Sequence, residues 1–229
     1  MITNNQHIKL VVKNIQKEML DYLSIVFERP SGFLFEAGDW IDLEFKQGIL
    51  KGGKTYSLSS SPTEGDLVIT FRKGLSELKR ALQSACIGDE MYISQFGNDY
   101  DFQLNKNRSS VLIAGGVGIA PFRSMLKEMI DTHSKSDVLL IYLNQNQEFL
   151  FEDEINDWSI KLPNLSVTYI NTKDINRKKR EKLIQSIVKD MSQNFYISGP
   201  PGMVEVNEHL LIDMSVQVRN IRIDSFGGY

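Results

Sequence analysis

A glycine-rich turn near the middle of this sequence has the residue types that bind a phosphate group. Residues 111–121 read VLIAGGVGIAP, so an apolar run is followed by Gly115, Gly116 and Gly118 and then by a predicted helix. Glycine lets backbone N–H groups approach a pyrophosphate, and the N-terminus of the following helix attracts negative charge. Tight strand–helix turns also need glycine for steric reasons alone. The turn therefore indicates a nucleotide site only if it opens a parallel α/β sheet.

A second turn, FYISGPPGM in residues 195–203, has the same order of strand, turn and helix. It would place Ser198, Gly199 and Pro200 after the carboxyl end of a strand, which is where open α/β sheets bind ligands. A proline-rich connector in front of a helix is the alternative. Whether the first turn opens a parallel α/β sheet decides between a ligand site and a plain connector.

A strand in the first half of the chain combines a cation, an aromatic ring and several hydroxyl groups. Residues 54–60 read KTYSLSS, and strand alternation places Lys54, Tyr56 and Leu58 on one face, with Ser57 and Ser59 on the other. These residue types suit a ligand that has a phosphate and a flat ring. A solvent-facing strand that binds nothing is the alternative.

A third turn, RKGLS in residues 72–76, leads into a predicted helix. Ser76 is the expected N-cap, and the helix N-terminus behind Arg72, Gly74 and Leu75 is a place for a second phosphate group. A plain capping turn explains the same residues without a ligand.

Two different patterns of predicted elements position these turns. Short alternating runs separated by turn signals, with one helix over residues 77–85, predict a small antiparallel barrel in residues 1–105. Alternating strands and helices predict a doubly wound parallel sheet in residues 106–229. We expect a ligand cleft between the two domains. The predicted barrel strands are 7–14, 19–28, 40–45, 55–59, 67–72 and 90–94, the later strands 111–114, 138–143, 166–170, 195–197 and 217–223, and the later helices 121–132, 151–160, 177–190 and 203–214.

Composition excludes several classes of chemistry for this 229-residue chain. Cys86 is the single cysteine and the three histidines lie far apart, so disulfides, iron–sulfur clusters and zinc sites are not expected. A net charge of −3 argues against nucleic acid as the main partner. Neither a membrane-length apolar run nor a secretory signal is visible, so we expect a cytoplasmic protein without a membrane partner. Redox chemistry would need an organic cofactor.

The motifs, taken in order, resemble those of the ferredoxin–NADP reductase superfamily. The five motifs are Lys54-x-Tyr-Ser-x-x-Ser60, Gly74-x-Ser76, Gly88-Asp89, Gly-Gly-x-Gly-x-x-Pro121 and Ser-Gly-Pro-Pro201. Upstream of them, Phe35-Glu-Ala-Gly-Asp-Trp40 resembles a turn of the same family. The ending IDSFGGY is similar to that of its short bacterial members. The resemblance covers residues 8–229. It implies a flavin-binding antiparallel barrel followed by a nicotinamide-dinucleotide domain.

The resemblance also implies roles for single residues. Tyr56 would stack on the flavin ring, Ser57 would bond near its hydride-accepting nitrogen, and Lys54 would take the usual place of an arginine on the flavin phosphate. Ser76 on a pyrophosphate favours FAD over FMN. The remaining members of the predicted cofactor site are Leu58, Ser59, Arg72, Gly74 and Leu75.

In the second domain, Gly115, Gly116 and Gly118 would face the pyrophosphate of NAD(P)H. Ser198, Gly199 and Pro200 would face the nicotinamide, and Phe226 or Tyr229 would cover the other flavin face. Departures from the family pattern are Lys54 for arginine, Asp39 for glutamine, Val117 for threonine and Ser198 for cysteine. Lysine keeps the charge but lacks the bidentate fork of arginine.

The choice between NADPH and NADH rests on residues 171–174, NTKD. Thr172 and Lys173 lie where the family places a serine–arginine pair, which favours the 2′-phosphate of NADPH. Asp174 would equally serve the ribose of NADH, and a solvated charge run is the alternative to both.

We therefore expect an enzyme that passes hydride from NAD(P)H to bound FAD and electrons to an external acceptor, either a separate carrier protein of the ferredoxin or flavodoxin kind or a small molecule. A net charge of −3 in residues 1–105 gives no sign of a basic face for an acidic carrier. A free-flavin reductase, which uses flavin as substrate, is one alternative. A nucleotide-sensing subunit with little turnover is another.

Overall fold

The first six strands form an antiparallel sheet whose two edges meet. The computed structural model describes residues 7–19, 21–45 and 54–226. The strand order is β4-β3-β6-β1-β2-β5, and Leu58, directly after β4, pairs with Ile69 of β5. This contact joins the outer strands, so the sheet closes into a barrel as predicted. The strands are β1 (Ile8–Met19), β2 (Tyr22–Glu28), β3 (Trp40–Phe45), β4 (Lys54–Ser57), β5 (Asp66–Arg72) and β6 (Glu90–Gly97).

Alternation along these strands produces the barrel core. Leu10, Ile41, Leu43 and Ile93 are fully buried, while their neighbours along the same strands are more exposed. Helix α1 (Glu77–Gln83) follows β5 and packs Leu82 into the same core. The barrel is therefore stabilised by an ordinary apolar interior.

The second half of the chain is an open parallel sheet with the order β11-β10-β7-β8-β9. The chain runs outward from β7 to β9 and then returns to β10 on the other side of β7, so the strand order reverses between β7 and β10. Ligands of open α/β sheets bind at such a reversal, beyond the carboxyl ends of the strands. The strands are β7 (Ser110–Gly115), β8 (Val138–Asn144), β9 (Leu165–Asn171), β10 (Asn194–Gly199) and β11 (Ile221–Ser225).

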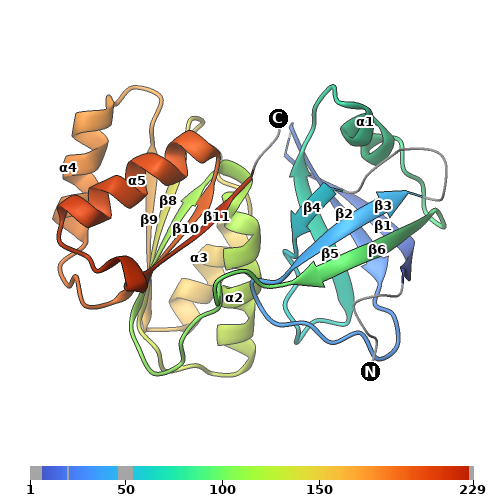
Figure 1. Ribbon diagram of the computed structural model, residues 1–229, viewed down its shortest axis with the longest axis horizontal. Coiled ribbons are helices and arrows are strands. Elements are labelled where there is room, and N and C mark those ends of the chain that lie inside the picture. Colours follow the sequence, from blue (N-terminus) through green and yellow to red (C-terminus); the bar gives the residue numbers. More distant parts are fainter. Residues whose placement is uncertain (1–6, 20, 46–53, 227–229) are drawn as a thin grey trace.

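Helices cover both faces of this sheet, and one of them faces the barrel. Helices α2 (Ile119–Asp131) and α3 (Glu152–Lys161) pack on one face, and α4 (Arg177–Ile187) and α5 (Pro201–Asp213) pack on the other. Helix α2 lies between the parallel sheet and the barrel (Figure 1). Tyr22 and Phe102 from the first half of the chain join the apolar cluster around α2.

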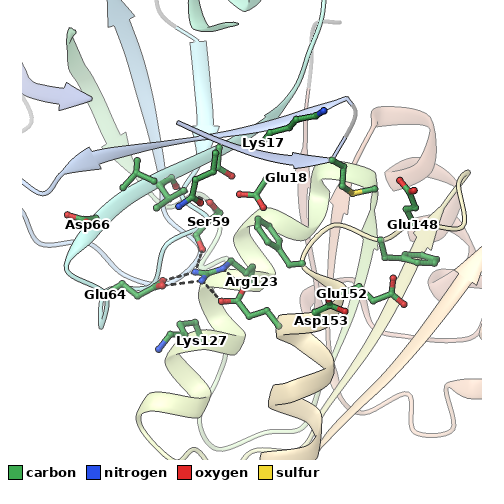
Figure 2. A pocket seen from close by; sticks show the side chains of 18 of the residues that line it. Lys17, Glu18, Ser59, Glu64, Asp66, Arg123, Lys127, Glu148, Glu152 and Asp153 are labelled. Carbon is green, nitrogen blue, oxygen red and sulfur yellow. Dashed lines mark hydrogen bonds and ion pairs between the residues drawn. The ribbon is translucent and has the colours of Figure 1, made fainter. Parts of the chain in front are cut away.

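Arg123 of α2 links the two halves through a network of charged groups. It donates to the Glu64 carboxylate at 2.6 and 3.1 Å and to the Ser59 carbonyl at 2.9 Å, both in the barrel half (Figure 2). On the other side it donates to Glu154 of α3 at 2.6 and 2.8 Å. The next residue, Ser124, donates its hydroxyl to the Ser60 carbonyl at 2.7 Å. These contacts fix the position of α2 against the barrel.

The predicted fold class is confirmed, and the differences lie at element ends. Strand β1 continues to Met19, so the second strand begins at Tyr22, because these two residues pair at the hairpin end. Helix α2 begins before Pro121, at Ile119, since a 3₁₀ turn, η1 (Gly116–Gly118), leads directly into it. The predicted last strand, 217–223, is a 3₁₀ turn, η2 (Val218–Asn220), followed by β11.

Replacing Arg123 by alanine should destabilise the fold by about 2–3 kcal/mol, because two partly buried carboxylates would lose their shared cation. The free energy of unfolding in urea measures this. The matched control is Lys127→Ala one turn later on α2, where the ion pair with Asp131 is more exposed and its loss should cost less than about 1 kcal/mol. Equal costs for the two variants would contradict the linking role of Arg123.

Candidate functional site

A cleft lies where strands β4 and β5 of the barrel meet the start of helix α2. The barrel supplies Tyr56, Ser57 and Arg72, and the second half supplies Val117 and Phe226. Its walls therefore combine an aromatic residue from each half with hydroxyl and cationic groups. This is the only described cleft in which the predicted KTYS strand and the predicted C-terminal aromatic residue occur together.

Three cations gather along one side of this cleft. They are Lys54 of β4, Arg72 of β5 and Lys79 of α1. Burial lowers the pKa of Lys54, and the pKa of Lys79 is lowered by burial and by the positive charges of Lys54 and Arg72. The charges of Lys54 and Arg72 that act on Lys79 form a region of positive potential, which suits the phosphates of a dinucleotide. Sequence analysis did not single out Lys79. Its position in the first turn of α1, three residues after the N-cap Ser76, is the signal that could have identified it.

Tyr56 presents a buried hydroxyl group at the wall of the cleft. The residue is 8% exposed, its ring lies 6.2 Å from that of Phe71 in an edge-on arrangement, and its Oη has no hydrogen-bond partner. Burial raises the pKa of this phenol, so it stays a neutral donor. Buried donors are almost always paired. An acceptor from a bound ring system would satisfy it, so the residues present fit a flavin here.

Asp224 of β11 joins the predicted flavin strand, at Ser57, to the predicted nicotinamide turn, at Ser198. Its Oδ2 accepts hydrogen bonds from Ser57 Oγ at 3.0 Å and from Ser198 Oγ at 3.2 Å. Burial raises the pKa of this carboxyl group, against the opposing effect of the two serine hydroxyls. Sequence analysis did not single out Asp224. Its signal is register: Ser198 of β10 pairs with Asp224 of β11, so their side chains share one face of the sheet.

The two glycine turns pack against one another at the carboxyl ends of β7 and β10. Gly116 has a φ of +55°, which favours glycine, and its carbonyl accepts a hydrogen bond from Tyr142 Oη at 2.9 Å. A Cβ atom at Gly118 would collide with the carbonyl of Ser198. The glycines thus have a steric role, and this packing brings the predicted pyrophosphate turn beside Ser198 and Gly199. Pro200 follows as the N-cap residue of α5.

Several predicted cofactor residues lie outside the cleft. Leu58 is fully buried in the barrel core, and Ser59 hydrogen-bonds Thr70 Oγ1 at 2.9 Å. Ser76 caps α1 by accepting a hydrogen bond from the Lys79 amide at 3.4 Å, as predicted, and Leu75 is 82% exposed. Gly74 precedes them and packs against the Lys79 side chain. The turn 74–76 therefore borders the cationic side of the cleft through Lys79.

Thr172 and Lys173 follow the carboxyl end of β9, at the same edge of the sheet as the glycine turns. The Thr172 backbone amide and hydroxyl both donate to the Asn144 carbonyl, at 2.7 and 3.1 Å. Lys173 is exposed. The hydroxyl predicted for a 2′-phosphate is thus engaged in joining two loops, while the lysine faces solvent. Tyr229 lies outside the described residues.

The largest cleft, about 1220 Å³, lies around Arg123 between the barrel, α2 and the start of α3. Of the predicted cofactor residues in the described part of the chain, it contains Ser59 alone (Figure 2). Glu18, Glu148, Glu152 and Asp153 line it, and this negative charge disfavours a phosphate. The smaller cleft at Tyr56 is therefore the better candidate for a dinucleotide.

Neither a metal-ligand cluster nor a membrane-spanning helix occurs in the part of the chain that the structure describes. Residues 7–19, 21–45 and 54–226 contain no group of three or more histidine, cysteine or acidic side chains arranged to hold a metal ion. Within the same ranges, each helix is too short or too polar to cross a membrane.

Residues 112–209 match the family model of the oxidoreductase NAD-binding domain. The chain is 26% identical over 194 residues to a flavohemoprotein of Halalkalibacterium halodurans (76% of this chain, 47% of the relative). It is 24% identical over 182 residues to the toluate 1,2-dioxygenase electron transfer component of Pseudomonas putida (76% and 54%). The chain spans about half the length of these curated relatives.

A solved ferredoxin NADP+ reductase from Neisseria gonorrhoeae, with bound FAD and NADP, has the same fold. The TM-score is 0.79 at 21% identity, with 96% of this chain and 98% of that one covered. A flavohem-like FAD/NAD binding domain of a Vibrio cholerae nitric oxide dioxygenase superposes with a TM-score of 0.80 at 20% identity, covering 96% and 98%. Residues 112–209 thus match an oxidoreductase NAD-binding domain, and the whole chain has the two-domain fold of these solved structures.

Proposed function

We propose that this chain is an NAD(P)H-dependent flavoprotein reductase that passes electrons to a separate acceptor. The observation that carries the proposal is the shared carboxylate of Asp224, which holds Ser57 of the barrel and Ser198 of the parallel sheet at one point. A flavin held by the first domain and a nicotinamide held by the second would meet there. FAD, when bound, supplies hydride acceptance and electron release, and the protein contributes binding and orientation.

The barrel residues would hold the flavin by charge and by stacking. Tyr56 offers its ring and its unpartnered hydroxyl, and Lys54, Arg72 and Lys79 offer positive charge for phosphate groups. Ser57, Leu58 and Ser59 continue the same segment. Three cations match the two phosphates of FAD better than the single phosphate of FMN, and this supports FAD as the flavin. FAD and NADP are bound in a solved structure with this fold.

The second domain would hold the nicotinamide dinucleotide at the strand-order reversal. The turn 115–118 would take the pyrophosphate at the start of α2, and Ser198, Gly199 and Pro200 would border the nicotinamide. The exposed cation of Lys173 supports NADPH, since the hydroxyl of Thr172 is already engaged with Asn144. We propose the domains as 1–105 for flavin and 106–229 for the dinucleotide.

The acceptor is a carrier protein or a small molecule outside this chain. One relative is named as the electron transfer component of a dioxygenase, which supports electron delivery to a separate protein.

A free-flavin reductase is the second candidate, because Lys54 replaces the arginine of the family pattern. An ammonium group makes no bidentate contact with a phosphate, so flavin would dissociate more readily. Flavin that elutes with the protein in gel filtration favours the first function, and flavin that is lost completely favours the second.

The direct test is turnover of the flavin-loaded protein with NADH and with NADPH, using ferricyanide as electron acceptor. The expected result is a yellow protein that oxidises at least one nicotinamide in a ferricyanide-dependent manner. Protein that neither binds added FAD nor oxidises either nicotinamide would overturn the proposal.

Tyr56→Ala should weaken flavin binding by about fivefold or more, because a stacked aromatic face contributes roughly 1 kcal/mol beyond its buried area. Fluorescence titration with FAD measures the change. Tyr56→Phe is the matched control, since it keeps the ring and should bind flavin more tightly than Tyr56→Ala. Equal affinity in the alanine variant and the wild type would place the flavin elsewhere.

Lys173→Ala should raise the KM for NADPH by about fivefold while leaving that for NADH unchanged, because only NADPH has the 2′-phosphate that a cation would contact. Steady-state kinetics with both nicotinamides measures the change. Lys178→Ala, at another exposed lysine nearby in sequence, should change neither value. An equal rise for NADH and NADPH in Lys173→Ala would remove the basis for the NADPH preference.

Asp224→Asn should change how stability depends on pH. Burial raises the pKa of Asp224 in the folded state, so the folded protein binds this proton more tightly than the unfolded chain does. Wild-type stability is therefore lost as the pH rises from the ordinary aspartate value, about 4, through the raised one. Relative to wild type, the variant should become progressively more stable as the pH increases from about 4 to 7.

Urea unfolding across this pH range measures the effect, and Asp190→Asn provides a control of opposite sign. Hydrogen bonds from Ser192 lower the pKa of Asp190, so its stabilisation is present above the ordinary pKa and is lost as the pH falls. That variant should therefore lose stability relative to wild type as the pH rises. Parallel pH profiles for Asp224→Asn and wild type would show that Asp224 titrates normally.

A further inference from the structure

A second cleft with positive charge lies at the opposite edge of the parallel sheet, where the strands begin. It has a volume of about 560 Å³ and lies beside the first residues of β10 and β11. The cofactor turns follow the carboxyl ends of the same strands. A strand of six residues is about 20 Å long, so this cleft is separate from the proposed nicotinamide site.

Three arginines line this cleft, and no carboxylate does so within the described residues. Arg108 comes from the segment between the two domains, Arg219 from the 3₁₀ turn η2, and Arg222 from β11. Arg108 is held by Asn220 Oδ1, at 3.4 Å from Nη1, and by the carbonyl of Ser192. The guanidinium of Arg222 lies over the ring of Tyr196, 5.5 Å from its centroid.

One negative charge that the structure relates to these arginines is that of Asp190. Its pKa is lowered by hydrogen bonds from Ser192 and, to a smaller extent, by the charge of Arg108. This carboxylate does not line the cleft. The lining of the cleft carries three guanidinium groups and no carboxylate among the described residues, which gives it net positive charge.

Two donors that line the cleft have no acceptor in the protein. Asn194 is 2% exposed, and its buried Nδ2 makes no hydrogen bond. Arg222 Nη1 is also buried and unpartnered. A buried donor without an acceptor costs free energy, most of all on a charged group. An anion in the cleft would accept hydrogen bonds from both groups and would remove this cost.

We propose that this cleft binds a small polyanion that carries phosphate or carboxylate groups. Guanidinium groups contact both kinds of anion through paired hydrogen bonds. The volume lies in the range of small-molecule sites, about 300–1,000 Å³, and exceeds what a single inorganic ion fills. The proposal uses residues that the cofactor site does not use, so it stands independently of the proposed reductase activity.

The test is calorimetric titration of the whole protein with pyrophosphate and with citrate, at constant ionic strength. Saturable binding of either probe is expected, and the tighter of the two identifies the anion class. Arg219→Gln/Arg222→Gln should weaken binding about tenfold or more, because two charge-assisted contacts are lost. Arg177→Gln, an exposed arginine of α4 that pairs with Glu181, should bind the probe as the wild type does.

The side-chain amide of Asn194 provides a local readout that the nicotinamide site would not affect. Its NMR resonance should shift on addition of the tighter probe in wild-type protein, with the same saturation profile as the calorimetric signal. If the double variant does not fold, Arg219→Gln alone replaces it, since this side chain is exposed. No saturable binding of either probe, or unchanged affinity in the arginine variants, would overturn the proposal.

Discussion

The position of helix α2 against the barrel is the constraint on which the candidate site depends. Arg123 provides it by ion-pairing with Glu64 of the barrel half and with Glu154 of α3. A largely buried cation must keep its carboxylates, so separating the two halves would leave Glu64 without its cation and Arg123 with Glu154 alone. The walls of the Tyr56 cleft come from both halves. The width of the Tyr56 cleft therefore depends on the ion pairs of Arg123, which lie outside this cleft and beside the larger, acidic one.

The order of the motifs predicts the fold and the two cofactor turns, because each depends on local sequence. Glycine at 116 is needed for its positive φ, and Ser76 caps α1, so these features can be recognised one segment at a time. Asp224 could not be found in this way. Its importance arises from the parallel pairing of β10 with β11 and from the approach of the barrel, which bring two serines from distant segments to one carboxylate. Element ends were displaced by up to five residues, the largest shift being at the end of β1, because strand pairing and neighbouring 3₁₀ turns set them.

Net charge conceals how the ionised groups are distributed. The chain has a formal charge of −3, and yet two of its clefts are each lined by three cations, while a third is lined by seven carboxylates and three cations. Lys54, Arg72 and Lys79 come from three successive elements that converge only in the closed barrel. Composition alone gave no reason to expect a basic surface on the flavin half. The pKa of Lys79, lowered by burial and then by the charges of Lys54 and Arg72, is the electrostatic sign that the cations are close together.

The end of β11 has a kinetic consequence. Phe226, which lines the Tyr56 cleft, is tied to the second domain by a hydrogen bond from its backbone amide to the Gly199 carbonyl at 3.1 Å. A nicotinamide that stacks on the flavin from this side must move the aromatic ring. One backbone hydrogen bond at the end of an edge strand contributes only about 1 kcal/mol net. Loop motions take nanoseconds to microseconds, so displacement of a ring held by so weak a contact would be far faster than a typical turnover and would not limit its rate.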